Sequence, residues 1–219
     1  MNPLKQLNTF GQSVYMDEIR RSMLSGQLAK LIQDDGLHGV TSNPAIFEKA
    51  IAQTDDYKEA FKKFVNSESV EVIYETLVTE DIAAAADAFR KQYDASDGRF
   101  GYVSIEVSPN LAYDTPGTIT EARHLWKLLN RPNIFIKVPA TKEGLPAIQQ
   151  LISEGINVNV TLIFGLERYR EVTEAYISGL EARAAKGEST ERVFSVASFF
   201  LSRMDVLLDP MLEKANLKD

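Results

Sequence analysis

The sequence has no cysteine and only two histidines, and these shortages exclude several kinds of site. Without cysteine there can be no disulfide, no thiolate metal site and no cysteine nucleophile, and a reducing compartment is permitted. His38 and His124 are far apart in the sequence and have different neighbours, so neither a zinc site nor a Ser-His-Asp triad has an obvious starting point. We therefore expect no bound metal.

Positive charge and long apolar runs are also in short supply. The chain has 24 Lys and Arg against 31 Asp and Glu, which gives a net charge of −7. A field of this sign repels phosphodiester backbones, so nucleic acid is not an expected partner. No apolar run approaches the length of a bilayer span, and the N-terminal segment MNPLKQLNTFGQS lacks the apolar core of a secretory signal. We expect no membrane association and a cytoplasmic location.

Glycine-rich phosphate-binding loops are missing as well. Neither G-x-G-x-x-G nor G-x-x-x-x-G-K-S/T occurs, so the sequence does not favour binding of a dinucleotide or a nucleoside triphosphate. What is present is an ordinary globular composition of 219 residues, 44% of them hydrophobic and 25% charged. This is enough for one sizeable core, and no linker or low-complexity tract divides it, so we predict a single domain over residues 1–219.

Short β-branched or aromatic runs alternate with longer segments of helical apolar spacing, and this alternation predicts repeated βα units. Several of the runs are apolar on both faces, as strands of a parallel sheet are. The expected strands are residues 13–19, 38–41, 101–107, 134–139, 156–163 and 193–198.

The expected helices lie between these strands. Residues 26–35 are predicted to form a helix that Gly36 ends, and two helices are expected within residues 45–93. The clearer of these two covers residues 69–93, which contain the helix-favouring run IAAAADAF.

Later helices are predicted from capping and periodicity. Thr118 and Glu121 have the spacing of a capping box ahead of a helix that carries Leu125. Pro210 should kink or divide the last helix. Further helices are expected from just after Thr141 to about Ser153, and over residues 166–186 and 201–215.

Parallel strands joined by helices form either an open doubly wound sheet or a closed eight-stranded barrel. Nearly every predicted strand ends in a polar side chain, and barrels build active sites from such strand ends. These side chains are Asp17, Asn43, Glu106, Lys137, Asn159 with Thr161, and Ser198. With no glycine-rich loop to favour the open sheet, the sequence predicts an α/β fold of the TIM (β/α)8-barrel type, with about six βα units present in this chain.

Lys137 lies inside the apolar segment NIFIKVPAT, with no carboxylate next to it in the sequence. Burial disfavours the charged ammonium, so part of this amine would be neutral at about pH 7 and able to attack a carbonyl carbon, forming a Schiff base. The alternative is a lysine that extends to the strand end or pairs with a buried carboxylate. The local sequence leaves both interpretations open.

Two carboxylates have comparable positions. Asp17 and Glu106 end the segments SVYMDEI and YVSIEV, where burial of an unpaired carboxylate is costly. One can act as a general acid or base beside the amine, while the other positions a water or stabilises the protonated lysine. A structural ion pair with Lys137 satisfies the same charges and also stays open.

Four other polar residues stand at or near strand ends. Pro44 keeps Asn43 out of a helix, so its amide is held at a strand-to-loop corner where it could bind a sugar hydroxyl, although Asn-Pro is common in turns. Asn159 and Thr161 alternate on one face of INVNVTLIF. Arg203 could bind a phosphate, although an arginine in this position is more often in a surface ion pair. His38 and His124 are assigned to packing or to the surface.

Six segments, taken together and in chain order, resemble the transaldolase family. The resemblance runs from near Ser13 to about Pro210, and GVTSNP and IKVPAT are its most specific pieces. The chain is similar to the longer bacterial type and to the N-terminal part of transaldolase and phosphoglucose isomerase fusions. The six segments are SVYMDEIRR, GVTSNPAIF, SIEVSP, IFIKVPAT, NVNVTLIF and SVASFFLSR.

The resemblance implies a metal-free and cofactor-free aldol transfer in the pentose phosphate pathway. A dihydroxyacetone unit would pass from sedoheptulose 7-phosphate or fructose 6-phosphate to an aldose phosphate, so sugar phosphates are the expected partners. Lys137 matches the family's Schiff-base lysine, and Asp17 matches its acid/base. Glu106 and Thr161 match the pair that holds a water for the proton transfers.

The resemblance also implies how substrate is held. Asn43 and Asn159 match groups that bind the dihydroxyacetone unit, Ser198 lines the site, and Arg203 matches an arginine that binds the substrate phosphate. The related fructose 6-phosphate aldolases have glutamine at the position of Glu106 and tyrosine at that of Phe200. Both residues therefore favour transaldolase. Phe200 is the last predicted site residue.

The strand count falls short of a closed barrel. Such barrels need about 250 residues, and the family's last two strands have no counterpart before Asp219. We therefore expect this chain to be the N-terminal portion of a longer transaldolase. Its unpaired strand edges would favour association, as a homo-oligomer or with another polypeptide. The alternatives are an inactive fragment that depends on such association, or an activity like that of fructose 6-phosphate aldolase.

Overall fold

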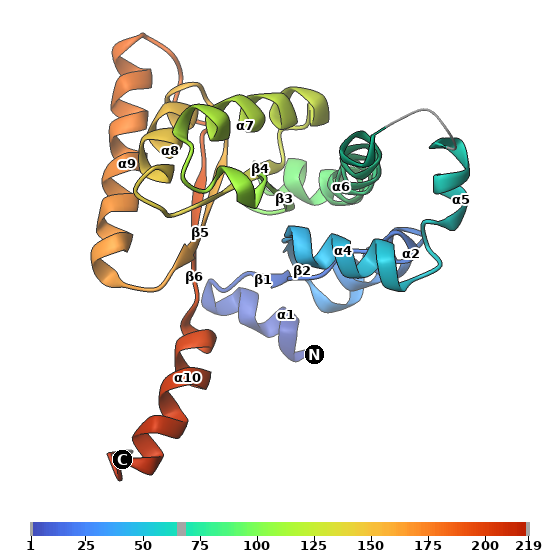
Figure 1. The fold of residues 1–219 in the computed structure, drawn as a ribbon, viewed down its shortest axis with the longest axis horizontal. Helices are drawn as coiled ribbons and strands as arrows, with labels where there is room; N and C mark the ends of the chain where they lie inside the picture. The colour runs from blue at the N-terminus through green and yellow to red at the C-terminus, as the bar shows by residue number, and fades with distance from the viewer. Residues whose placement is uncertain (1, 65–68, 218–219) are drawn as a thin grey trace. The chain divides into compact units, whose positions relative to one another are not determined.

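Six β-strands alternate with helices in the part of the chain that this computed structural model describes, residues 2–64 and 69–217 (Figure 1). They form a sheet in the order β1-β2-β3-β4-β5-β6, and the pairs β1–β2, β2–β3 and β5–β6 are parallel. Parallel neighbours joined by helical crossovers are the repeat of a TIM barrel, so the predicted α/β class and partial barrel are confirmed. The strands are β1 (Val14–Met16), β2 (Leu37–Val40), β3 (Tyr102–Glu106), β4 (Ile134–Pro139), β5 (Val158–Ile163) and β6 (Ser195–Phe199).

The chain divides into two compact units. Unit 1 comprises Met1–Pro109 and Glu121–Ile136, and unit 2 comprises Asn110–Thr120 and Lys137–Asp219. β4 therefore begins in unit 1 and ends in unit 2. That the whole chain is one domain stays a prediction, and the two units are described in turn.

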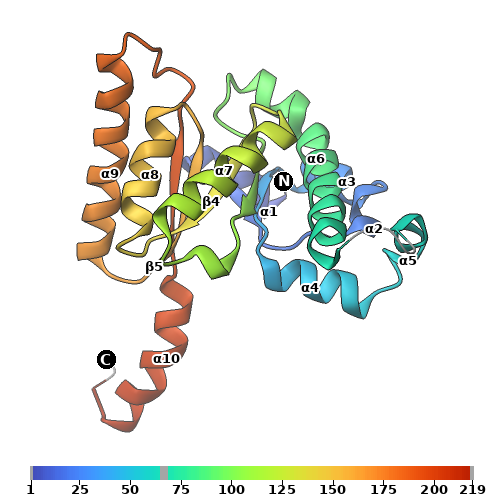
Figure 2. The same cartoon turned by 45° about the horizontal axis from the view of Figure 1, so that its top comes forward.

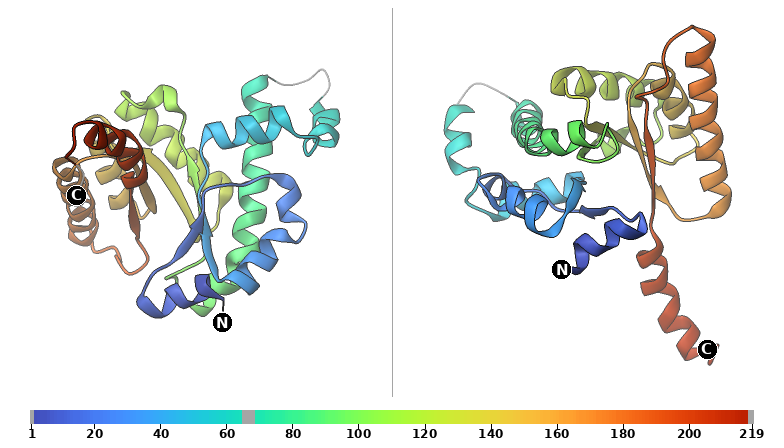
Figure 3. Two further views of the ribbon diagram at one scale, coloured as in Figure 1. Left: turned by 90° about the horizontal axis from the view of Figure 1, so that it is seen from below. Right: turned by 180° about the vertical axis from the view of Figure 1, so that it is seen from behind.

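Helices connect the strands of unit 1, and β1 and β2 lie side by side within it (Figure 3). The longest helix contacts β2, β3 and two of the short helices, so it is the central packing element of this unit. The helices are α1 (Pro3–Leu7), α2 (Arg21–Leu24), α3 (Gln27–Lys30), α4 (Pro44–Gln53), α5 (Lys58–Phe61) and α6 (Val70–Ala95), with short 3-10 or π turns at Asn8–Phe10, Leu31–Asp35 and Lys62–Phe64.

α6 confirms the helix predicted over residues 69–93. Ser69 is its N-cap and accepts a hydrogen bond from the Val72 backbone N–H at 3.4 Å. Ile82 and Phe89 on its inner face are fully buried, at 0% exposure. Each such side chain contributes about 1.5–3 kcal/mol of burial free energy, so packing adds to the helix propensity of the alanine-rich run.

One of the two helical predictions in unit 1 is confirmed and the other needs correction. The helix expected over residues 26–35 is present as α3 followed directly by a π-type turn over Leu31–Asp35, and Gly36 ends it as predicted, with φ of 69°. The stretch 45–93 holds the short α5 in addition to its two long helices. In that stretch apolar spacing indicated helix but could not locate the breaks.

The predicted capping box is wrong. α7 (Thr115–Leu129) begins before Thr118, so this threonine lies inside the helix, where its Oγ1 donates to the Leu111 carbonyl at 3.0 Å. Glu121 accepts from the Ser108 backbone N–H at 3.1 Å instead of capping the helix. Both side chains bind the loop that follows β3, a tertiary contact that local spacing does not reveal.

In unit 2, α8 (Gly144–Ser153) and α9 (Leu166–Ala185) lie side by side (Figure 2). Thr141 Oγ1 accepts from the Gly144 N–H at 2.9 Å, consistent with a helix predicted to follow Thr141. Ile148 and Leu151 of α8 are fully buried, at 0% exposure. This apolar face forms the core of unit 2 together with β5 and α9.

α10 (Leu201–Lys214) follows β6, and none of its residues is buried (Figure 3). Pro210 stays within it, so the helix is not divided there, while the alternative expectation of a kink stays a prediction. An apolar helix face of this kind usually covers another element. The exposed apolar residues of α10 are Leu201, Val206, Leu207, Leu208, Met211 and Leu212.

Within residues 2–64 and 69–217, no helix combines the length and hydropathy of a bilayer span.

Gly39 allows the close approach of three strands in unit 1. It pairs with Tyr15 of β1 on one side and with Tyr102 of β3 on the other. A Cβ at this position would lie 2.5 Å from the Tyr102 carbonyl oxygen and would overlap the Tyr15 ring. A backbone oxygen cannot move aside as a flexible side chain does, so the site has no space for a methyl group.

We therefore expect Gly39→Ala to lower the free energy of unfolding by about 1–3 kcal/mol through overpacking, measured by urea denaturation. The matched control is Gly165→Ala, where a Cβ has no neighbour within 4 Å and φ is −146°. Equal stability of the two variants would contradict the close packing of the three strands at Gly39.

Candidate functional site

The predicted site residues divide between the two units, and each group is described by itself. Nearly all of them stand at or near the ends of strands, as the alternation of the sequence indicated. Unit 1 holds Asp17, Asn43 and Glu106, and unit 2 holds Lys137, Asn159, Thr161, Ser198, Phe200 and Arg203.

Asp17 lies just beyond β1, which ends at Met16, and its side chain is exposed. The strand predicted over residues 13–19 is shorter than expected, so Asp17 lies outside it and carries no burial cost. Asp17 accepts a hydrogen bond from Thr41 Oγ1 at 2.7 Å, and the Thr41 backbone N–H donates to the Met16 carbonyl at 2.9 Å. Thr41 was missed as a partner of Asp17, although it belongs to the GVTSNP motif.

Asn43 occupies the predicted strand-to-helix corner. Its backbone is extended, with φ of −154°, and Pro44 is the first residue of α4. The side-chain oxygen accepts from the Ile46 backbone N–H at 3.0 Å, so Asn43 is the N-cap of α4. Ser42 donates to the Ser104 carbonyl at 2.7 Å, which fixes the end of β2 against β3. Asn43 is thus held by local capping, the simpler of the two roles considered for it.

A cavity of about 460 Å³ in unit 1 brings Asn43 and Glu106 together. Tyr74 and Glu121 also line it, and burial raises the pKa of Tyr74 to about 12, with a further contribution from the charge of Glu106. Burial likewise raises the pKa of Glu121. Because its wall carries several carboxyl groups, this cavity suits neutral hydroxyl groups and disfavours phosphate.

Asp17 lines a second cavity of unit 1, of about 380 Å³. Arg20 and Lys49 line it together with Glu18, so acidic and basic side chains face the same space. The Asp17 carboxylate is exposed at this cavity and is therefore reachable from solvent.

The two histidines have the packing and surface positions predicted for them. His38 is buried and stacks on Phe100, with ring centroids 4.0 Å apart, and burial lowers its pKa. His124 lies on the surface, where Nε2 is 3.0 Å from Glu75 Oε1.

In unit 2, Lys137 is only 5% exposed, in a strand whose residues are all buried. Asn159, on the neighbouring strand β5, is 1% exposed. Ser198 of β6 donates through its hydroxyl to Asn159 Oδ1 at 2.8 Å. Two adjacent strands therefore bury an amine and an amide among apolar side chains, and the part-buried Ser198 hydroxyl of the next strand contacts the amide. Burial of such polar groups is costly unless they are hydrogen-bonded.

Thr161 lies at an irregularity of β5. The register between β5 and β6 shifts between Val160 and Ile163, and Leu162 has a left-handed φ of 61°. Thr161 is fully buried, and its Oγ1 has no hydrogen-bond partner among the residues that the structure describes. Bulges often direct a side chain into an active site, and non-glycine residues with positive φ are also concentrated at active sites. No feature of the sequence indicated this irregularity.

Phe200 and Arg203 lie where β6 leads into α10. The Arg203 guanidinium is 5.2 Å from the centroid of the Phe200 ring, and Phe200 meets Phe164 edge to face at 5.3 Å. The Arg203 side chain is exposed. Stacking on an aromatic ring leaves the N–H groups of a guanidinium free to bind an anion in its plane.

The strand order and the polar strand ends define a protein of the α/β-barrel class. The chain belongs to the transaldolase/fructose-6-phosphate aldolase family, whose sequence model matches residues 14–219. The proteins named transaldolase in Trichodesmium erythraeum and Thermobifida fusca are 49% and 50% identical to it, each over 97% of this chain. A transaldolase of Mycobacterium leprae is 46% identical over 97% of the chain. The chain spans 57–58% of the length of these relatives.

The unpartnered hydroxyl of Thr161 leads to a stability prediction. Thr161→Val replaces it with a methyl group of similar shape, so we expect the free energy of unfolding to rise by about 1 kcal/mol. Ser198→Ala is the contrast, because it removes the donor to Asn159 and should lower stability by a similar amount, about 1 kcal/mol. Urea denaturation measures both, and equal losses in the two variants would contradict the assignment of Thr161 as unsatisfied.

Proposed function

We propose that this chain carries the Schiff-base chemistry of a transaldolase. A dihydroxyacetone unit passes from a ketose phosphate, such as fructose 6-phosphate or sedoheptulose 7-phosphate, to an aldose phosphate in the cytoplasmic pentose phosphate pathway. The observation that carries this proposal is the buried amine of Lys137 in β4, within the segment that matches the family. Membership of the family and relatives named transaldolase support the reaction type.

Lys137 supplies the amine of this proposal, and the uncharged form of an amine is the one that attacks a carbonyl. The amine adds to the C2 carbonyl of the ketose, and loss of water leaves a protonated imine. Asp17 takes the proton of the C4 hydroxyl as the C3–C4 bond breaks, and the bonding electron pair passes to the imine nitrogen. The products are an enamine on Lys137 and a free aldose phosphate. The enamine then adds to the acceptor aldehyde, and hydrolysis restores the amine.

The other residues bind substrate or water in this proposal. Asn43 and Asn159 hold hydroxyl groups of the dihydroxyacetone unit, the first through its amide N–H groups because its oxygen caps α4. Glu106 and Thr161 hold the water of the proton transfers, a role supported by the unsatisfied Thr161 hydroxyl. Arg203 binds a substrate phosphate. Ser198 orients Asn159 through their hydrogen bond.

A second candidate is a chain that is inactive until it associates with another copy or another polypeptide. The exposed apolar side chains of α10 favour it. Fructose 6-phosphate aldolase activity is a third candidate, since the family includes both activities. It differs from transaldolase in releasing dihydroxyacetone without an acceptor.

Schiff-base formation is tested by reduction with borohydride in the presence of fructose 6-phosphate. We expect a sugar adduct at Lys137, located by peptide mass spectrometry, because the reduced imine is stable. Lys137→Met should give no adduct, whereas Lys142→Met, at an exposed lysine nearby, should keep it. A folded parent chain without an adduct would favour the second candidate.

The role of Asp17 is tested by separating attachment from cleavage. Because its proton transfer follows imine formation, Asp17→Ala should keep the trapped adduct within about twofold but slow release of glyceraldehyde 3-phosphate about 100-fold or more. The control is Glu18→Ala, which removes the adjacent exposed carboxylate. Loss of trapping as severe as the loss of cleavage would show that Asp17 has a different role.

A further inference from the structure

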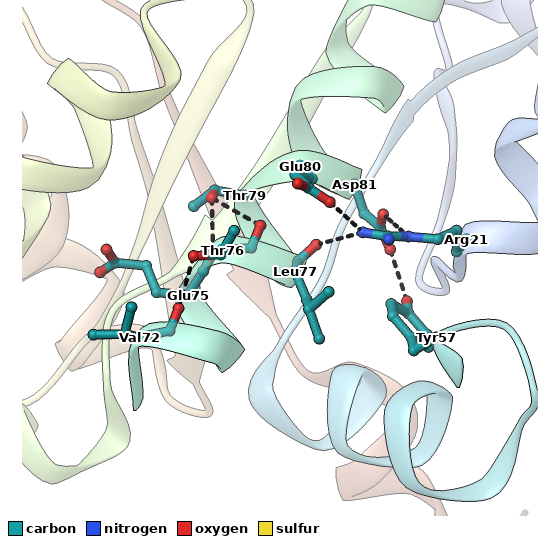
Figure 4. A network of polar contacts seen from close by, with 9 residues as sticks. All are labelled: Arg21, Tyr57, Val72, Glu75, Thr76, Leu77, Thr79, Glu80 and Asp81. Carbon is teal, nitrogen blue, oxygen red and sulfur yellow. Dashed lines mark hydrogen bonds and ion pairs between the residues drawn. The ribbon is translucent and has the colours of Figure 1, made fainter. Parts of the chain in front are cut away.

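Arg21 follows Asp17 by four residues and is the first residue of α2. Its guanidinium binds α6 at three points (Figure 4): Nε donates to Asp81 Oδ1 at 2.7 Å, and Nη2 to Glu80 Oε2 at 2.9 Å and to the Leu77 carbonyl at 3.3 Å. These contacts join residues about 60 positions apart in the sequence. The turn that carries Asp17 is therefore attached to the central helix of unit 1.

Asp81 completes a closed cluster. Its side chain is buried, with 2% exposure, and its second oxygen accepts from the Tyr57 hydroxyl at 2.7 Å. Arg21 also lies over the Tyr57 ring, 5.0 Å from its centroid. Each carboxylate oxygen thus has a donor, and the cation contacts both of the other groups (Figure 4). A buried carboxylate whose two oxygens both have donors has one favourable geometry and resists displacement.

The rest of the turn has fewer constraints. Ile19 is buried, and the Ser22 backbone N–H donates to Asp56 at 3.0 Å. Asp17 itself is exposed, and its hydrogen bond comes from Thr41. Since an exposed side chain takes its position from the backbone that carries it, the location of Asp17 depends on how firmly the following turn is held.

We propose that Arg21, Asp81 and Tyr57 are positioning residues that hold the turn between β1 and α2, and with it the Asp17 carboxylate, in its reactive place. The helical segment between β2 and β3 thereby serves the site through the ion pair of Arg21 with a buried carboxylate, although none of the three residues belongs to the predicted site. The inference rests on the proposed function in one respect, that Asp17 transfers the proton during cleavage. Misplacement of such a group by about 1 Å can slow a reaction about 100-fold.

The test compares Asp81→Asn with Asp87→Asn in the full chain. Both residues lie on α6 and pair with an arginine, but Arg131 binds Asp87 on the surface, at 2.7 and 2.8 Å, away from the turn. Hydrogen–deuterium exchange of peptides covering residues 14–22 reports the anchoring directly. We expect Asp81→Asn to speed exchange there by about tenfold or more, and Asp87→Asn to leave it within about twofold of the parent.

Trapping and cleavage supply the functional readout. Asp81→Asn should keep the borohydride adduct at Lys137 within about twofold and slow aldose phosphate release by about tenfold or more, whereas Asp87→Asn should change neither. Cleavage that falls no further than trapping would overturn the positioning role. Unchanged exchange in Asp81→Asn would overturn the inference whether or not the parent forms an adduct. A parent with no adduct but with faster exchange in Asp81→Asn would count against the proposed function alone.

Tyr57→Phe guards against a folding defect in Asp81→Asn. It removes one donor to Asp81 and keeps both the ion pair and the ring. As in Asp81→Asn, exchange should become faster and cleavage slower, each by about two- to fivefold. The unfolding transition should stay as cooperative as that of the parent. A Tyr57→Phe protein equal to the parent in both readouts would exclude the tyrosine from the positioning cluster.

Discussion

The buried carboxylate of Asp81 is the constraint on which the organisation of unit 1 depends. A charge removed from water costs several kcal/mol unless it is paired and hydrogen-bonded. Burial raises the pKa of Asp81, and the hydrogen bond from Tyr57 and the charge of Arg21 oppose that rise. Three segments that are distant in the sequence must therefore meet at one point. The position of the turn after β1 follows from this meeting.

Unit 2 also has buried polar side chains, which are an amide, a hydroxyl and one amine. Lys137, Asn159 and Thr161 carry polar atoms into strands that are otherwise apolar and buried. Asn159 is satisfied in part by Ser198, while Thr161 keeps an unsatisfied hydroxyl beside a bulge. An arrangement chosen for stability alone would place apolar side chains at these positions. Their retention in the core is the physical argument that they serve chemistry.

Much of the fold could be predicted because its signals are local. Alternation of apolar runs and helical spacing located all six strands, and β4 has the predicted bounds. The errors arose where distant segments decide the outcome. Thr118 and Glu121 have capping-box spacing, yet both bind the loop after β3. Asp17 is exposed because β1 is only three residues long, and its length is set by pairing with β2.

The sequence by itself determined the α/β class, the placement of polar residues at or near strand ends, and the family. These depend on periodicity and on motifs such as GVTSNP and IKVPAT. Tertiary structure alone decided which of these groups have partners. The pairing of Arg21 with Asp81, of Thr41 with Asp17 and of Ser198 with Asn159 joins residues at least 24 positions apart. Such contacts are absent from any local pattern, because they form only when packing brings separate βα units together.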